Sequence, residues 1–204
     1  MSTTESRVYG GRSFEDRRAE RRQHLVNIAI QAFGQRGARL VTVREICAEA
    51  KFTPRYFYES FATLEQLFEA AFEQVLQQLG MRMKEAMAGC MEPNPEALLK
   101  QAFTAYCQFL FEDRAAARVL LLEVYGMGMD MDRHISEFLQ NFGPYFQQMI
   151  MVANARSQRP ASSVGLVLTG LTGAIIMIGT RWVVTDCNAS IESVVESCLA
   201  VWLP

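Results

Sequence analysis

The sequence of 204 residues is long enough for one large domain or for a small domain joined to a larger one. Half of the residues are apolar and 21% are charged, as in a soluble globular protein with a core, and the five cysteines form no Cys-x-x-Cys pair, which argues against a disulfide framework or a zinc site. The net charge of −2 hides an asymmetry: residues 1–60 carry eleven Lys or Arg against seven Asp or Glu, whereas the remainder carries nine against fifteen, so only the N-terminal part is expected to meet a polyanion.

The N-terminal segment, MSTTESRVYGGRSFEDRR, contains no apolar stretch of the signal-peptide type. We therefore expect a cytoplasmic protein, without metal or cofactor, in which the cysteines are reduced core residues: Cys47, Cys90, Cys107, Cys187 and Cys198. Residues 1–16 are expected to form a flexible basic arm, followed by a small domain over 17–62 whose central motif covers about 42–61.

Residues 17–36 have the spacing of an amphipathic helix. Gly37 follows it, in the position that a C-terminal cap prefers. The apolar side chains recur at i, i+3, i+4, i+7 and i+8: Leu25, Ile28, Ala29, Ala32 and Phe33.

Capping patterns mark two more short helices. Thr42 and Glu45 have the spacing of a capping box, which predicts a helix starting at residue 43. Thr53 can cap the next helix, with Pro54 in its favoured first position. Phe57 and Phe61 lie four residues apart and are expected to face the core. The side chains between them then point elsewhere: Arg55, Tyr56, Glu59 and Ser60.

The rest of the chain is also predicted to be helical. Thr63 and Gln66 suggest another capping box at the start of a long helix that ends near Gly89. Asn94 can cap a helix to about Phe111, and four more are expected, over RAAARVLLLEVYG and about 133–155, 162–184 and 190–203. The fold class is therefore all-α with about nine helices, a three-helix N-terminal domain and a larger helical domain over 63–204.

Two short helices joined by a turn of three or four residues form a helix-turn-helix unit. The second helix of such a unit lies in the major groove with its N-terminal residues on base edges. The exposed first turn of the third helix would supply Thr53, Pro54, Arg55 and Tyr56, and arginine can read a guanine or hold a phosphate. A plain helical hairpin in a core is the alternative.

Many positions of this region keep a known spacing: Ala32, Phe33, Gly37, Thr42, Val43, Arg44, Glu45, Ile46, Ala50, Phe52, Thr53, Phe57, Tyr58, Phe61, Thr63, Glu65, Leu67 and Phe68. In this pattern, residues 22–72 resemble the DNA-binding domain of the TetR family of transcriptional regulators. The later helices resemble the family's ligand-binding and dimerising domain in number and order.

The resemblance implies contacts with double-stranded operator DNA, with Thr42 and Arg44 at the backbone and Tyr58 on phosphate. Ser60 and Leu64 stand where the family frequently has histidine and lysine, which predicts weaker phosphate contacts. Lys51 replaces the usual turn glycine, which predicts a strained or left-handed residue. The complete predicted DNA-binding set is Thr42, Arg44, Thr53, Pro54, Arg55, Tyr56, Tyr58 and Ser60. Basic residues before or within the first helix either compensate or form a solvated helix start: Arg12, Arg17, Arg18, Arg21 and Arg22.

The middle helices are rich in soft and aromatic side chains, which commonly line small-molecule sites. The family resemblance implies that a pocket exists, and the scarcity of charge predicts an apolar or aromatic effector. For any single residue of this kind, a place in the core is the more frequent outcome. The predicted ligand-binding residues are Phe103, Tyr106, Cys107, Tyr125, Met129, Phe142, Tyr145, Phe146, Met149 and Met177.

The uncharged stretch 160–180 is long enough to span a bilayer, but we prefer a soluble core helix buried on nearly all sides. In the resembled family the last two helices form a four-helix dimer interface. The predicted interface residues are Gly165, Thr169, Gly173, Ile191, Val194, Val195, Cys198 and Trp202.

These observations predict a homodimeric, ligand-responsive DNA-binding regulator with no membrane association. A repressor is expected, released from its operator when a ligand moves the long fourth helix. An enzyme is not expected, because the two histidines lack a partner motif and no nucleotide-binding or hydrolase motif occurs. A helical protein–protein adaptor that has lost DNA binding is the alternative.

Overall fold

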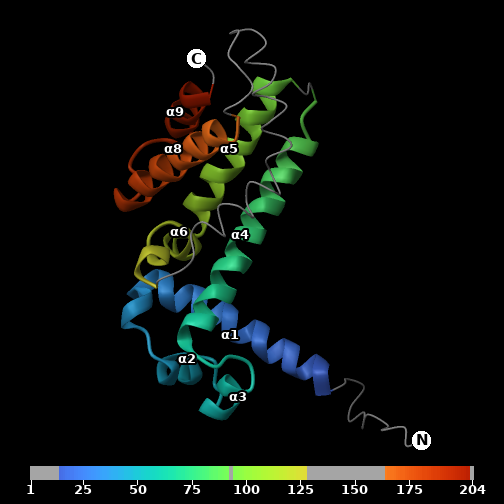
Figure 1. Ribbon diagram of the computed structural model, residues 1–204, viewed down its shortest axis with the longest axis vertical. Helices are drawn as coiled ribbons and strands as arrows, with labels where there is room; N and C mark the ends of the chain where they lie inside the picture. The colour runs from blue at the N-terminus through green and yellow to red at the C-terminus, as the bar shows by residue number, and fades with distance from the viewer. Residues whose placement is uncertain (1–13, 92–93, 128–163, 203–204) are drawn as a thin grey trace, which may run out of the picture.

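The structure is a computed structural model that describes residues 14–91, 94–127 and 164–202. Every regular element in these ranges is helical, as predicted (Figure 1). Two short 3₁₀ helices, η1 (Ala38–Leu40) and η2 (Glu123–Gly126), accompany the α-helices. The α-helices are α1 (Phe14–Arg36), α2 (Val43–Glu49), α3 (Pro54–Tyr58), α4 (Leu64–Ala88), α5 (Pro95–Glu112), α6 (Arg114–Leu121), α8 (Val164–Val184) and α9 (Ile191–Trp202). The helix expected over about 133–155 lies outside the described residues.

The N-terminal head consists of α1, η1, α2 and α3. The apolar stripe of α1 is confirmed, since Leu25 and Phe33 are fully buried, and Phe57 and Phe61 anchor α3 on the same core. α1 begins at Phe14, three residues earlier than expected, so the last residues of the predicted arm belong to the helix.

The predicted capping box of α2 is confirmed by two hydrogen bonds. Thr42 N donates to Glu45 Oε2 at 2.8 Å, and Glu45 N donates to Thr42 Oγ1 at 3.3 Å. The hydrogen bonds from Thr42 also lower the pKa of Glu45, because they favour its charged form.

Two other caps differ from the prediction. Thr53 is the N-cap of α3, but its side chain makes no capping hydrogen bond. At the start of α4, Thr63 Oγ1 accepts from Gln66 N at 3.3 Å, as expected, whereas Gln66 Oε1 accepts from Ala62 N instead of closing a box with the backbone of Thr63.

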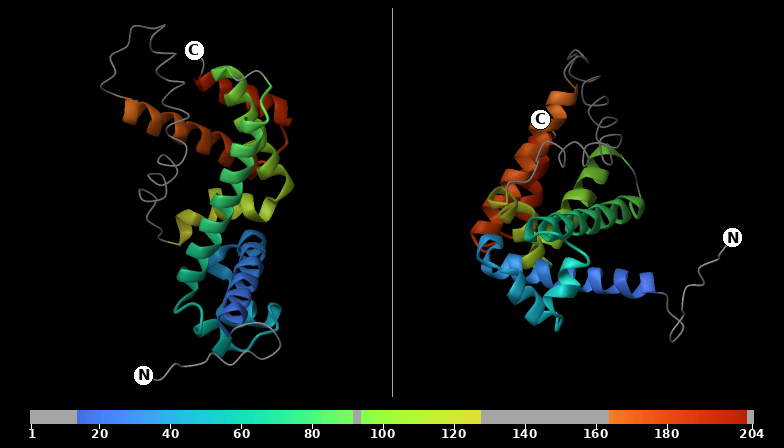
Figure 2. Two further views of the ribbon diagram at one scale, coloured as in Figure 1. Left: turned by 90° about the vertical axis from the view of Figure 1, so that its right-hand side faces the viewer. Right: turned by 60° about the horizontal axis from the view of Figure 1, so that its bottom comes forward.

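The long helix α4 connects the head to the C-terminal body, which contains α5, α6, α8 and α9 (Figures 1 and 2). It packs against α1 at one end and against α5 over most of its length. Leu67, Phe68, Val75 and Leu79 of α4 are buried in one core cluster that includes residues of both parts. The predicted domain boundary at 62/63 therefore coincides with the start of a helix that both parts share.

Helices α5 and α8 approach each other closely at Gly179. A Cβ atom there would lie 1.9 Å from the hydroxyl of Tyr106, so a side chain at this position would collide with the tyrosine. The Tyr106 hydroxyl donates to the carbonyl of Ile175 at 3.3 Å. Burial raises the pKa of Tyr106 well above its usual value, so the tyrosine is a neutral donor between the two helices.

The prediction that α8 is buried on nearly all sides is wrong. Only 33% of the stretch Leu166–Val184 is buried, although its length and composition alone would let it cross a membrane. One face packs against α5, α6 and α9. The other face is open, with Leu166 80% and Met177 61% exposed.

The apolar stripe of α9 faces its own protomer. Cys198 is fully buried, and the ring of Trp202 lies 6.2 Å from that of Phe103 on α5. Val194, Val195, Cys198 and Trp202 therefore pack within one protomer, and their place at a dimer interface stays a prediction.

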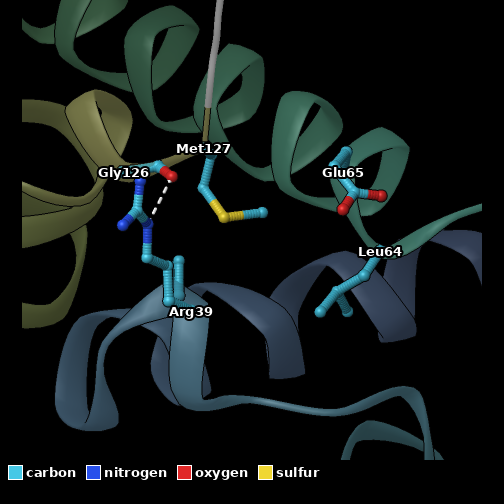
Figure 3. Close-up of a pocket in the computed structure, with 6 residues that line it drawn as sticks. Arg39, Leu64, Glu65, Gly126 and Met127 are labelled. Atoms are coloured by element: carbon cyan, nitrogen blue, oxygen red, sulfur yellow. Dashed lines mark hydrogen bonds between the residues drawn. The ribbon is translucent and has the colours of Figure 1, made fainter.

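The head contacts the body where α1 crosses α6. Arg118 Nε donates to the carbonyl of Gly34 at 2.8 Å, and Ala38 N donates to Glu123 Oε2 at 2.7 Å. Arg39 Nε donates to the carbonyl of Gly126 at 2.7 Å, as the dashed line in Figure 3 shows. The first of these hydrogen bonds joins α6 to α1, and the other two join η1 to η2, so together they hold the head against the body.

Candidate nucleic-acid interface

Helix α3 lies at the end of the head that is remote from α8 and α9 (Figure 1). Phe57 is the fully buried residue of α3, and the side chains of the first turn of this helix face outward. The side chain of Arg55 is 85% exposed. Thr53, Pro54 and Tyr56 are also exposed, so the first turn of α3 is available to a partner.

The other predicted DNA-binding residues lie on the same head. Thr42 and Arg44 are exposed at the start of α2, and Tyr58 is exposed at the end of α3. Ser60 is only partly accessible, so it offers less surface than the others. The structure thus places exposed side chains at the first turns of two consecutive helices, as a helix-turn-helix unit requires.

Arginines of α1 reach the C-terminal end of α3, a contact that local sequence patterns do not reveal. Arg18 Nη2 donates to the backbone carbonyl of Glu59 at 2.6 Å, and Arg21 Nη2 lies 3.7 Å from Glu59 Oε2. The Arg21 guanidinium also lies 4.9 Å from the centre of the Tyr56 ring, within the range of a cation–π contact. Two of the arginines predicted near the arm, Arg18 and Arg21, therefore contact the helix that is predicted to read DNA.

Aromatic contacts also hold Tyr56 in place on this side of the head. The ring of Phe52 lies 5.5 Å from that of His24 on α1 and 5.9 Å from that of Tyr56 on α3. Both pairs meet edge to face, which is the favoured geometry of aromatic rings. Tyr56 is thereby fixed between Phe52 and Arg21 and lies with one side open to solvent.

The predicted effector residues do not form one group. Phe103, Tyr106 and Cys107 are buried in the core of the body, whereas Tyr125 and Met177 are exposed. Tyr125 and Met177 therefore do not lie in the buried core with the other three, and their role in a pocket stays a prediction. The other five candidates lie outside the described residues: Met129, Phe142, Tyr145, Phe146 and Met149.

Two cavities among the described residues are lined by none of the predicted effector residues. One, of about 460 Å³, opens at the head–body junction between Arg39, Leu64, Glu65 and Met127 (Figure 3). The other, of about 350 Å³, lies between α1 and α4 and is lined mainly by polar side chains. Within the described ranges, no cluster of three or more His, Cys, Asp or Glu could hold a metal ion.

The arrangement defines an all-helical regulator with an N-terminal helix-turn-helix head. Residues 25–71 match the family model described as bacterial regulatory proteins, tetR family. The N-terminal head of this chain is therefore similar to the DNA-binding domain of the TetR family of transcriptional regulators.

Curated relatives carry the same kind of name. The HTH-type transcriptional regulator BetI of Brucella canis is 27% identical over 155 residues, which are 74% of this chain and 77% of the relative. The regulator of the same name from Brucella anthropi is 33% identical over 98 residues, or 47% of this chain and 50% of the relative. These relatives are transcriptional regulators and not enzymes.

Solved structures share the fold. The transcriptional regulator FadR from Bacillus subtilis, in complex with stearoyl-CoA, has a TM-score of 0.73 at 18% identity, covering 89% of this chain and 97% of that chain. The fatty acid degradation regulator FadR from Bacillus halodurans has a TM-score of 0.72 at 18% identity, covering 90% and 94%.

Proposed function

We propose that this regulator represses transcription by binding an operator as a homodimer and leaves the operator when a small apolar or aromatic effector binds its body. The observation that supports DNA binding most directly is the open first turn of α3. Arg55 extends there with an 85% exposed side chain, beside arginines of α1. An arginine at this place can donate two parallel hydrogen bonds to a guanine, and its neighbours can contact phosphates.

The proposed contacts divide into two kinds. Arg55 and Tyr56, with Thr53 and Pro54, would enter the major groove and read base edges. Thr42, Arg44, Tyr58 and Ser60 would hold the phosphate backbone and fix the register without reading sequence. The function and the residue roles are open to test because the two kinds of contact respond differently to salt and to base changes.

The proposed dimer interface would determine how the two DNA-binding heads are placed relative to each other. A dimer that joins the outward faces of α8 would present two heads to two half-sites of a duplex. Thr169 and Gly173 are exposed on this face, and Gly165 lies in the first turn of α8. Ile191, the first residue of α9, is partly buried.

An apolar effector is supported by the composition of the body. Phe103 and Cys107 on α5 are buried among mainly apolar side chains, and Tyr106 contributes a buried hydroxyl beside them. A ligand that binds one position of α4 better than the other would shift the head, and allosteric couplings of this kind are typically about 1–3 kcal/mol. The solved structure of FadR from Bacillus subtilis is described in complex with stearoyl-CoA. Because the acyl chain of that ligand is apolar although its CoA group is charged, a long-chain acyl-CoA is the first compound to test.

The experiment is the selection of bound duplexes from random DNA by the purified protein, followed by a mobility shift on the selected site. Arg55→Ala should weaken binding to this site by at least about tenfold, the loss of one bidentate base contact, and relax the preference at one base pair. Arg82→Ala, on the body, is the matched control and should bind like the wild type. Equal binding by the Arg55→Ala variant would contradict the assignment of the reading helix. Acyl-CoA is then added to the wild-type complex, and an unchanged shift would exclude this effector class.

A further inference from the structure

Glu59 is an acidic residue within the proposed reading surface. This surface comprises the first turn of α3, with Arg55 and Tyr56, and the neighbouring arginines Arg18 and Arg21 of α1. Glu59 is the C-cap of α3, and its side chain is 30% exposed. Its carboxylate accepts from Arg55 Nε at 3.1 Å and lies 3.7 Å from Arg21 Nη2, while its backbone carbonyl accepts from Arg18. One residue therefore contacts three arginines, two from α1 and one from α3.

The contact with Arg55 uses a particular nitrogen. Glu59 Oε1 accepts from Nε, which lies at the root of the guanidinium, so the two terminal Nη groups stay available for a ligand. The bidentate recognition of guanine needs two parallel donors of one guanidinium aimed at O6 and N7. A carboxylate that holds Nε limits the rotation of the side chain and so aims the remaining donors.

The charge of Glu59 has a second consequence. Non-specific DNA binding depends almost entirely on contacts between cationic side chains and phosphates. A carboxylate on the reading surface neutralises part of the charge of Arg21 and Arg55 and repels a phosphate that approaches them. This cost applies to every duplex, whereas the gain from an aimed Arg55 applies only where a guanine is correctly placed.

We propose that Glu59 is a specificity-determining residue that positions Arg55 for base reading and suppresses the binding of non-operator DNA. The proposal rests on the proposed function, because it concerns the same surface. Glu59 needs no contact with DNA for this role, since it acts through Arg55 and Arg21.

The test compares Glu59→Gln with the wild type on the selected operator and on a permuted duplex of equal length and composition, by fluorescence anisotropy at several KCl concentrations. Glutamine keeps the size and the backbone contact with Arg18 but removes the charge. Affinity for the permuted duplex should rise about fivefold, with a log–log salt slope steeper by about one unit, which corresponds to one added phosphate contact. The ratio of operator to permuted affinity should fall by about tenfold.

Glu112→Gln is the matched control. Glu112 pairs with Arg82 on the body, so its substitution removes the same charge away from the reading surface. It should change neither the affinity ratio nor the salt slope. A thermal scan of each variant separates a structural role from the proposed one, because an ordinary surface ion pair would alter the melting temperature and leave the ratio alone.

The outcomes distinguish this inference from the proposed function. If wild-type protein prefers the operator and Glu59→Gln keeps the wild-type ratio within twofold, the role of Glu59 is refuted while the regulator function stands. The role of Glu59 is also refuted, and the regulator function again stands, if Glu112→Gln lowers the affinity ratio as much as Glu59→Gln does. If wild-type protein binds neither duplex in a salt-dependent manner, the proposed function fails, and the inference fails with it.

Discussion

At the residue scale, the turn between α2 and α3 depends on a lysine in a left-handed conformation. Lys51 has φ of 57°, as its place in the family's glycine position predicted. Its N–H donates to Ala48 O at 3.2 Å and the next N–H, of Phe52, donates to Cys47 O at 2.8 Å, which is the Schellman pattern at a helix end. The β-carbon of lysine makes this conformation costly, whereas glycine adopts it without strain.

We therefore expect Lys51→Gly to stabilise the protein. The gain should be about 0.5–1 kcal/mol, because relief of the left-handed strain outweighs the extra freedom of glycine in the unfolded chain. Urea unfolding followed by circular dichroism measures it. Lys51→Ala is the matched control, since it loses the same charge but keeps the β-carbon. A midpoint for Lys51→Gly no higher than that of Lys51→Ala would contradict the argument.

At the element scale, the head is fixed to the body by direct backbone contact between two helices. A Cβ atom on Gly34 would lie 2.3 Å from the carbonyl oxygen and 2.4 Å from the Cα atom of Ala115. The contact brings α1 against α6 so closely that Arg118 can reach the Gly34 carbonyl. Glycine is required here by the approach of a second backbone and not by its own φ angle.

Gly34→Ala should destabilise the protein by about 2–3 kcal/mol, the usual cost of forcing an extra carbon between well-packed elements. The rigid backbone of α6 cannot yield as a flexible side chain would. The control is Gly89→Ala at the C-terminal end of α4, where the added carbon would meet only ordinary van der Waals neighbours, the nearest at 3.6 Å. There alanine should be neutral or stabilising by up to about 1 kcal/mol. Equal unfolding midpoints for the two variants would show that α1 and α6 can separate freely.

These contacts also show how much of the structure could be predicted from the sequence. Local spacing in the sequence predicts the helices of the head, the capping box at Thr42 and the buried side of α3. The structure confirms all three. The approach of α6 to Gly34 and the contact between Arg18 and Glu59 join residues that are distant in sequence, so no local pattern contains them. Exposure could not be predicted for α8 and α9 either, because an apolar stripe does not say whether its own protomer or a partner covers it.

At the scale of the whole molecule, the described part of the body leaves an apolar surface uncovered on the open face of α8. Leu166, Met177 and Val184 are exposed along this helix, and Val201 on α9 is exposed as well. Contiguous exposed apolar surface on a soluble protein usually marks an interaction site. Because TetR regulators are dimers, a second copy of this chain is the expected partner, and α8 is where the two copies are proposed to meet.

Met177→Glu should convert the dimer into a monomer, because a carboxylate buried at the centre of an apolar interface loses its hydration without gaining a partner. Operator affinity should fall by at least about tenfold with it, since each monomer contacts a single half-site. Light scattering and a mobility shift measure the two effects on the same sample. Met91→Glu is the matched control, because Met91 is 95% exposed at the end of α4, away from α8. A Met177→Glu protein that scatters as a dimer at the wild-type concentration would place the interface elsewhere. A monomer with wild-type operator affinity would instead separate assembly from DNA binding, so the two measurements test the dimer surface and its purpose independently.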